Sequence, residues 1–119
     1  MAEPEVSDAV LGEVESSIYS LDSERLLTVM KEQSVSANTC GSYLRNMPLI
    51  HMALDAEWQE ATQGDGTYLP RYEILKALLD LGADPTSVYL GVDARENATN
   101  LGLTAAVEIL DRHAANRAP

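Results

Sequence analysis

Residues 72–85 read Tyr-Glu-Ile-Leu-Lys-Ala-Leu-Leu-Asp-Leu-Gly-Ala-Asp-Pro, and this stretch decides the predicted fold. Its apolar residues recur at helical spacing, so one face of the predicted helix needs a cover. Gly82 follows the last turn, where a residue with positive φ commonly ends a helix. Pro85 prevents the helix from resuming. Because one such helix cannot bury its apolar face alone, the rest of the chain must supply the cover.

The chain repeats this helix ending in degenerate form. Residues 26–38 align with residues 75–87 at an offset of 49, and residues 105–114 align with residues 74–83 at an offset of 31. A period in the low thirties is typical of helical-repeat arrays. The longer offset fits such a period if about 16 residues are inserted, and the polar, Gly-containing segment 56–69 is the predicted insertion.

Two segments resemble the two helices of an ankyrin repeat. Residues 78–85, Leu-Leu-Asp-Leu-Gly-Ala-Asp-Pro, resemble the ending of its second helix, and residues 47–54, Met-Pro-Leu-Ile-His-Met-Ala-Leu, resemble its first. The match departs from the family at Met47, where Thr is expected, and at His51, which stands one place late. The resemblance implies an all-α fold of stacked antiparallel helix pairs in a short solenoid. An unrelated helical bundle with a Gly-terminated helix is the alternative.

The length of 119 residues predicts a single domain, and polar residues indicate where its helices begin. Ser7 or Asp8, Asp22 and Asp93 each precede an apolar or helical run and are expected to cap a helix. The predicted organisation is one domain over 1–119, with an N-terminal capping helix pair at 8–33, a central repeat at 46–82 containing the insertion 56–69, and a C-terminal helix pair at 93–114.

The net charge of −11 bounds the kind of partner. Nucleic acids and anionic membranes both require basic residues for binding, so neither is predicted as a partner. A protein with a basic surface is the expected one. The single cysteine, Cys40, cannot form an internal disulfide and favours a reducing compartment. With no long apolar run, the sequence predicts an intracellular, cytoplasmic protein.

No pattern of catalytic or cofactor-binding residues stands out. Gly64-Asp65-Gly66 lacks the Lys of a phosphate loop and the spaced carboxylates of a calcium loop. His51 is more typical of a structural histidine than of a ligand, and a metal site would want more His or Cys. We therefore expect no catalytic residue, no metal and no cofactor. The predicted function is a non-catalytic interaction module that binds, and regulates or inhibits, another protein.

Aromatic residues outside the predicted helix stripes are the candidate contacts, because Trp and Tyr are favoured anchors at interfaces. The predicted partner-binding residues are Trp58 and Tyr68 in the insertion, and Tyr43, Arg45 and Tyr89 in the two projecting linkers. Packing of these side chains against their own loops is the competing interpretation.

Two other functions stay open from the sequence. One is a small enzyme whose site combines His51, Asp55 and Tyr68 around the insertion. The other is a small-molecule binding protein, with Trp58 lining a cavity between the insertion and the helices. The sequence specifies neither the identity of a partner nor the oligomeric state.

Overall fold

The computed structural model describes residues 7–40, 47–63 and 72–117, and in these it contains six α-helices and no β-strand. The predicted all-α class is therefore confirmed for the described residues. No helix among them is long and apolar enough to span a membrane. The helices are α1 (Asp8–Tyr19), α2 (Ser23–Glu32), α3 (Leu49–Gln63), α4 (Glu73–Asp80), α5 (Ala94–Asn100) and α6 (Thr104–Arg117).

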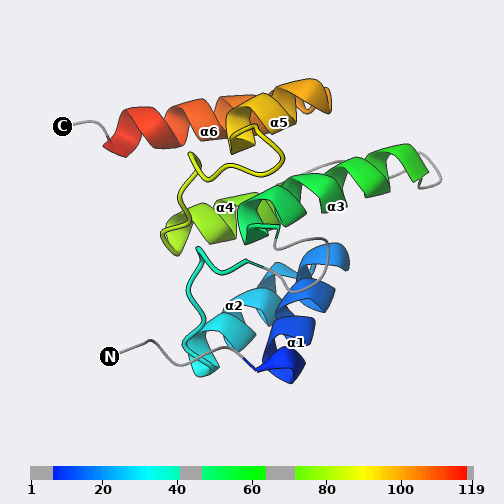
Figure 1. The fold of residues 1–119 in the computed structure, drawn as a ribbon, viewed down its shortest axis with the longest axis vertical. Coiled ribbons are helices and arrows are strands. Elements are labelled where there is room, and N and C mark those ends of the chain that lie inside the picture. Colours follow the sequence, from blue (N-terminus) through cyan, green and yellow to red (C-terminus); the bar gives the residue numbers. More distant parts are fainter. Residues whose placement is uncertain (1–6, 41–46, 64–71, 118–119) are drawn as a thin grey trace.

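The helices lie in three layers, each made of two helices that follow one another in the chain (Figure 1). Between layers, α3 contacts α1 and α5, and α4 contacts α2 and α6. The molecule therefore has two columns of helices. We call α1, α3 and α5 the odd column and α2, α4 and α6 the even column.

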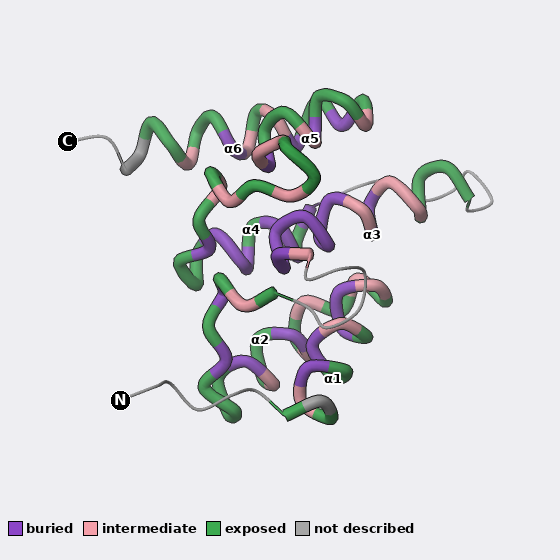
Figure 2. Tube along the Cα trace, viewed as in Figure 1, coloured by how far each residue is buried: buried purple, intermediate pink, exposed green. Residues whose placement is uncertain are grey.

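The start of α3 is the centre of the core. Leu49, Ile50, Met52 and Leu54 are all buried, although consecutive residues point to different sides of a helix (Figure 2). This is possible because α1, α4 and α5 all pack against α3. An amphipathic helix such as α4 needs a cover on one side only, whereas the first turns of α3 are covered on several.

Three polar caps predicted from the sequence start helices in the structure. Ser7 accepts a hydrogen bond from the Val10 amide at 3.2 Å, and Asp22 accepts one from the Arg25 amide at 3.1 Å. Asp93 accepts one from the Glu96 amide at 2.9 Å. These bonds satisfy amide groups that have no partner within the first turn of a helix.

Four of the helices end with the same backbone motif. A residue with positive φ follows the cap, and the next amide donates to the carbonyl five residues earlier, which satisfies an otherwise unpaired carbonyl. The positive-φ residues of α1, α2, α4 and α5 are Leu21 (57°), Ser34 (52°), Gly82 (97°) and Gly102 (74°). The hydrogen bonds run from Asp22 to Ser17, Val35 to Met30, Ala83 to Leu78 and Leu103 to Ala98.

This motif confirms the predicted ending at Gly82 and corrects both sequence alignments. Ser34 is the structural equivalent of Gly82, so the offset between the two helix ends is one residue shorter than the alignment indicates. The alignment of residues 105–114 with the end of α4 is wrong at its last residues. Helix α6 does not stop at 114 but continues to Arg117, because Ala114 and Ala115 are strong helix formers and no Gly or Pro interrupts the segment.

The predicted insertion also differs from the structure. Residues 56–63 belong to α3, which runs without a break to Gln63, and only the rest of the segment 56–69 lies outside the described residues. Ala, Glu and Gln favour the helix, and no Gly or Pro stands between Pro48 and Gly64 to stop it. The predicted insertion is therefore helical over residues 56–63, and Trp58 stands on a helix.

Substitutions at the helix ends test the positive-φ motif. A Cβ at Gly82 would meet no atom within 4 Å, so the strain of Gly82→Ala comes from the backbone alone and should cost about 1–2 kcal/mol. Ser34→Gly relieves similar strain and should stabilise the protein by up to about 1 kcal/mol. Gly12→Ala is the matched control, because the same change inside α1 should stabilise by about 0.5–1 kcal/mol. Urea unfolding measures the free energy of unfolding of all three variants. If the Gly82→Ala and Gly12→Ala changes shift it in the same direction, the positive-φ motif at Gly82 is contradicted.

A second pair of substitutions tests the core. Leu78 is fully buried in α4, and Leu78→Ala should lower the free energy of unfolding by roughly 2–5 kcal/mol through lost burial and a residual cavity. Leu27 is 38% exposed, so Leu27→Ala should change stability by no more than about 0.5 kcal/mol. Comparable losses for both variants in thermal or urea unfolding would argue against this packing.

Candidate functional site

A small hairpin between α4 and α5 projects two apolar side chains. Leu90 and Gly91 have φ of 53° and 86°, the signs required of a two-residue turn that matches strand twist. The turn is closed by hydrogen bonds between Tyr89 and Val92, at 2.9 Å and 3.2 Å. Val88 is 62% and Leu90 is 73% exposed, so both side chains are offered to solvent.

The base of this hairpin is held by the buried imidazole of His51. Its Nε2 lies 2.7 Å from the Ser87 carbonyl oxygen, which can only accept, so we assign the proton to Nε2. Its Nδ1 then accepts from the Asn97 amide group at 2.9 Å. The ring also lies 5.8 Å from the ring of Tyr89. Because both ring nitrogens are engaged, neither is available as a catalytic base or a metal ligand.

Burial lowers the pKa of His51 below its usual value of 6.5, and the Ser87 carbonyl and Asp93 oppose this shift. Removing an imidazolium from water costs more than removing the neutral ring, which is why burial dominates. His51 is therefore neutral at pH 7, as the assigned hydrogen bonds require.

Asp55 stands one turn after His51 but has other partners. Its Oδ2 accepts from the Tyr19 hydroxyl at 2.8 Å and from the Gln59 side-chain amide at 3.0 Å. Burial raises the pKa of Tyr19, and the bond to Asp55 raises it further, so the phenol remains a donor. Although His51 and Asp55 stand one helical turn apart, each makes its hydrogen bonds to other residues. The two side chains connect α3 to different neighbours.

Together the hairpin, α3 and α5 border a half-open cavity of about 150 Å³. Four of its eight lining residues have apolar side chains, and Asp55 is the one among the eight with a formal charge. The lining residues are Met47, His51, Asp55, Tyr89, Leu90, Val92, Asn97 and Leu101. We call this space the hairpin cavity.

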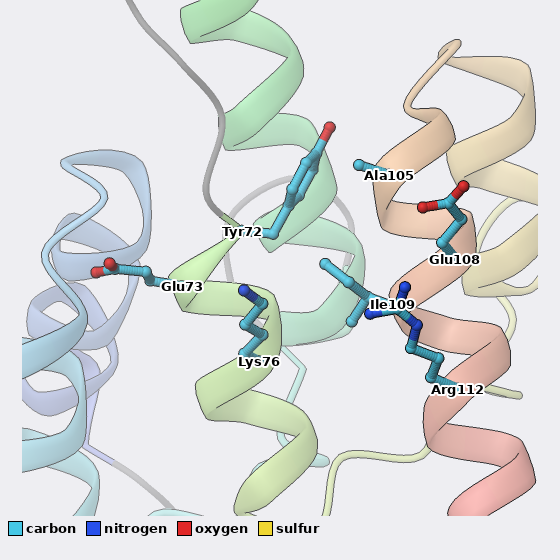
Figure 3. A pocket seen from close by; sticks show the side chains of 7 residues that line it. All are labelled: Tyr72, Glu73, Lys76, Ala105, Glu108, Ile109 and Arg112. Carbon is cyan, nitrogen blue, oxygen red and sulfur yellow. The ribbon is translucent and has the colours of Figure 1, made fainter.

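A larger groove of about 420 Å³ lies on the even column, between α4 and α6 (Figure 3). Its lining residues include two basic ones, Lys76 and Arg112, and two acidic ones, Glu73 and Glu108. Figure 3 shows Glu73 extending away from the groove toward the first layer, where Ser23 donates to it at 3.3 Å. Buried Tyr72 forms part of the wall, and burial, with Glu57 nearby, raises its pKa. With Glu73 turned away, two basic side chains and the carboxylate of Glu108 remain at the groove, so it does not favour a basic partner.

Charge divides between the two columns. Helices α1 and α3 contain acidic residues and no basic ones. The one basic residue of α5 is Arg95, which pairs with Asp111 of α6 at 2.8 Å. The helices of the even column carry the other basic residues of the helical part of the chain, Arg25, Lys31, Lys76, Arg112 and Arg117. The odd column is therefore the acidic side of the molecule.

The structure separates the contact residues predicted from the sequence. Tyr89 lies in the hairpin, where it is partly buried and lines the hairpin cavity beside the ring of His51. Trp58 does not stand in a loop; it is a half-buried residue of α3 packed against the core. Tyr43, Arg45 and Tyr68 lie outside the described residues. In the described part of the chain, no group of three or more His, Cys, Asp or Glu residues could hold a metal ion.

Sequence reasoning missed the apolar members of the hairpin, Val88, Leu90 and Val92. The dipeptide Leu90-Gly91 is a weak turn signal, because Leu seldom adopts positive φ. Met47 and Leu101 were missed for another reason: they meet the hairpin only because α3 and α5 pack side by side.

Comparison of the chain with models of protein families, with curated proteins and with solved structures finds no match.

The state of His51 predicts a pH dependence of stability. Because the native pKa is lowered, the unfolded chain binds the proton more readily between that value and pH 6.5. The free energy of unfolding should therefore rise with pH over this window, by at most about 1.4 kcal/mol per pH unit, and level off above it. Urea unfolding of wild type and His51→Gln checks this. The difference in free energy of unfolding between the two proteins should shrink below pH 6.5 and stay constant between pH 7 and 8. The same difference at every pH would contradict the prediction.

Proposed function

We propose that this chain is a short ankyrin-like stack of helix pairs that binds, and regulates or inhibits, a partner protein with a basic surface. The observation that carries the proposal is the exposed apolar hairpin standing on the acidic column of the molecule. Ankyrin-like stacks have no chemistry of their own and offer a surface to a partner.

Repeated backbone geometry supports the repeat arrangement. The loops that follow α2 and α4 are closed at their bases by similar hydrogen bonds, from the Leu49 amide to the Thr39 carbonyl at 3.3 Å and from the Ala94 amide to the Pro85 carbonyl at 3.2 Å. The Asn38 side chain bridges to the next layer. It donates to the Gly82 carbonyl at 3.2 Å and accepts from the Asp84 amide at 2.7 Å.

In this proposal, charge affects the rate of association and apolar contact affects the rate of dissociation. The net charge of −11 attracts a basic surface and raises the association rate, within a Debye length of about 8 Å at physiological ionic strength. Charge alone gives little specificity. Val88 and Leu90 supply apolar area that is desolvated only in the complex, and such anchors mainly slow dissociation.

The aromatic contacts proposed from the sequence fit this surface to different degrees. Tyr89 belongs to it directly, and Tyr43, Arg45 and Tyr68 stay in the proposal on sequence grounds. Trp58 contributes only the exposed part of its ring. We also propose an intracellular, cytoplasmic site of action, because the exposed thiol of Cys40 suits a reducing compartment.

Selection of random peptides on the immobilised protein tests the proposal. The recovered peptides should combine Lys or Arg with an apolar residue. Their affinity, measured by surface plasmon resonance, should fall at least about tenfold in the double variant Val88→Ser, Leu90→Ser, the effect of losing one hot spot. Raising the salt concentration should lower the association rate by screening.

The matched control is Leu27→Ser, Leu81→Ser, which removes two exposed leucines from the even-column side. It should leave binding unchanged. Acidic peptides, or peptides that lose affinity in the control variant but not in the hairpin variant, would refute the proposed surface.

A further inference from the structure

We propose that the hairpin cavity receives the side chain of a lysine from the partner protein. This inference rests on the proposed function and names the group that the acidic side recognises. It is carried by the composition of the cavity: apolar walls around one carboxylate, beside an aromatic ring.

The carboxylate of Asp55 is held in place for such a contact. Tyr19 of α1 and Gln59 of α3 itself both donate to Oδ2, at 2.8 Å and 3.0 Å, and so hold the side chain in place. Its Oδ1 accepts no hydrogen bond from the described residues. A cationic donor at Oδ1 would add a charge-assisted hydrogen bond, which is about twice as strong as a neutral one.

The walls suit the aliphatic part of lysine. Met47, Val92 and Leu101 are apolar, and a lysine stem can lie along such a surface while its ammonium reaches a polar end. The ring of Tyr89 adds a face that attracts cations. A volume of about 150 Å³ matches one side chain, since apolar cavities near this size bind a single small ring such as benzene.

Lysine fits this cavity better than arginine. A guanidinium is planar and binds carboxylates best through two parallel hydrogen bonds, one to each oxygen. Oδ2 of Asp55 already accepts two hydrogen bonds, so the carboxylate offers one oxygen. An ammonium is a compact point charge and needs only that one. The adjacent His51 does not repel it, because its Nδ1 carries no proton in the assigned hydrogen-bond pattern.

Nuclear magnetic resonance with blocked tripeptides tests the inference. Acetyl-Gly-Lys-Gly-amide should shift the backbone amides of Tyr89, Asn97 and Leu101 in a saturable way. The same peptide with norleucine, which keeps the stem and loses the charge, should bind at least about tenfold more weakly, and so should the arginine peptide. If the norleucine peptide binds the wild-type protein as tightly as the lysine peptide does, the inference is overturned.

Two variants locate the effect. Asp55→Asn removes the charge but retains an oxygen for Tyr19, and it should abolish the preference for lysine over norleucine. Glu60→Gln is the control, because it removes one acidic charge from an exposed position of the same helix. This control variant should still prefer lysine over norleucine. If Glu60→Gln also loses the preference, the attraction is only long-range, and the cavity is not the lysine site.

The outcomes distinguish this inference from the proposed function. If selected peptides bind the hairpin but are insensitive to Asp55→Asn, the lysine site is wrong and the interaction module stands. If the lysine tripeptide binds as expected but selection recovers no hairpin-dependent peptide, the site stands and the proposed function fails.

Discussion

Burial of the first turns of α3 is the constraint on which the rest of the structure depends. Leu49, Ile50, Met52 and Leu54 are inaccessible to solvent, and each buried side chain of this kind contributes roughly 1.5–3 kcal/mol. No single neighbouring helix can cover all sides of α3. The first layer covers one side through α1, the third covers another through α5, and α4 covers the side within its own layer. The three-layer order follows from this requirement.

Polar contacts then set the register between layers. Tyr19 and Asp55 link the first layer to the second, and His51 links the second to the loop and helix of the third. Partly buried polar groups are costly without partners, so a shifted stack would leave these groups unsatisfied. Apolar packing favours compact stacking in general, whereas these hydrogen bonds favour one alignment. The same residues position the hairpin and the carboxylate of the cavity, so the contacts that order the stack also shape the candidate site.

The functional argument rests on asymmetry rather than on a catalytic group. The two columns differ in charge because the basic residues of the helices lie almost entirely on α2, α4 and α6. The groove of the even column is larger, but two basic side chains and one carboxylate face it, whereas the smaller hairpin cavity has Asp55 as its one charged residue. Size alone would select the groove. The charge of the cavity makes it the better candidate site, because specific recognition needs a charge or a hydrogen bond that a wrong partner cannot satisfy.

Local features of the fold could be read from the sequence by itself. The caps at Asp22 and Asp93, the span of α5 and the positive φ at Gly82 depend on a few neighbouring residues, and their physical causes are steric and short-range. The all-α class followed from the recurring helix ending together with the resemblance to ankyrin repeats. The extension of α3 through Trp58 was a local feature that polar composition concealed, because Glu and Gln suit both loops and exposed helices. Tertiary structure alone decided the partners of His51 and Asp55, since Ser87, Asn97 and Tyr19 lie 36 to 46 residues away in the chain. It also decided the hairpin cavity and the separation of charge into columns, because both arise where helices distant in sequence pack side by side, and no short-range pattern encodes that neighbourhood.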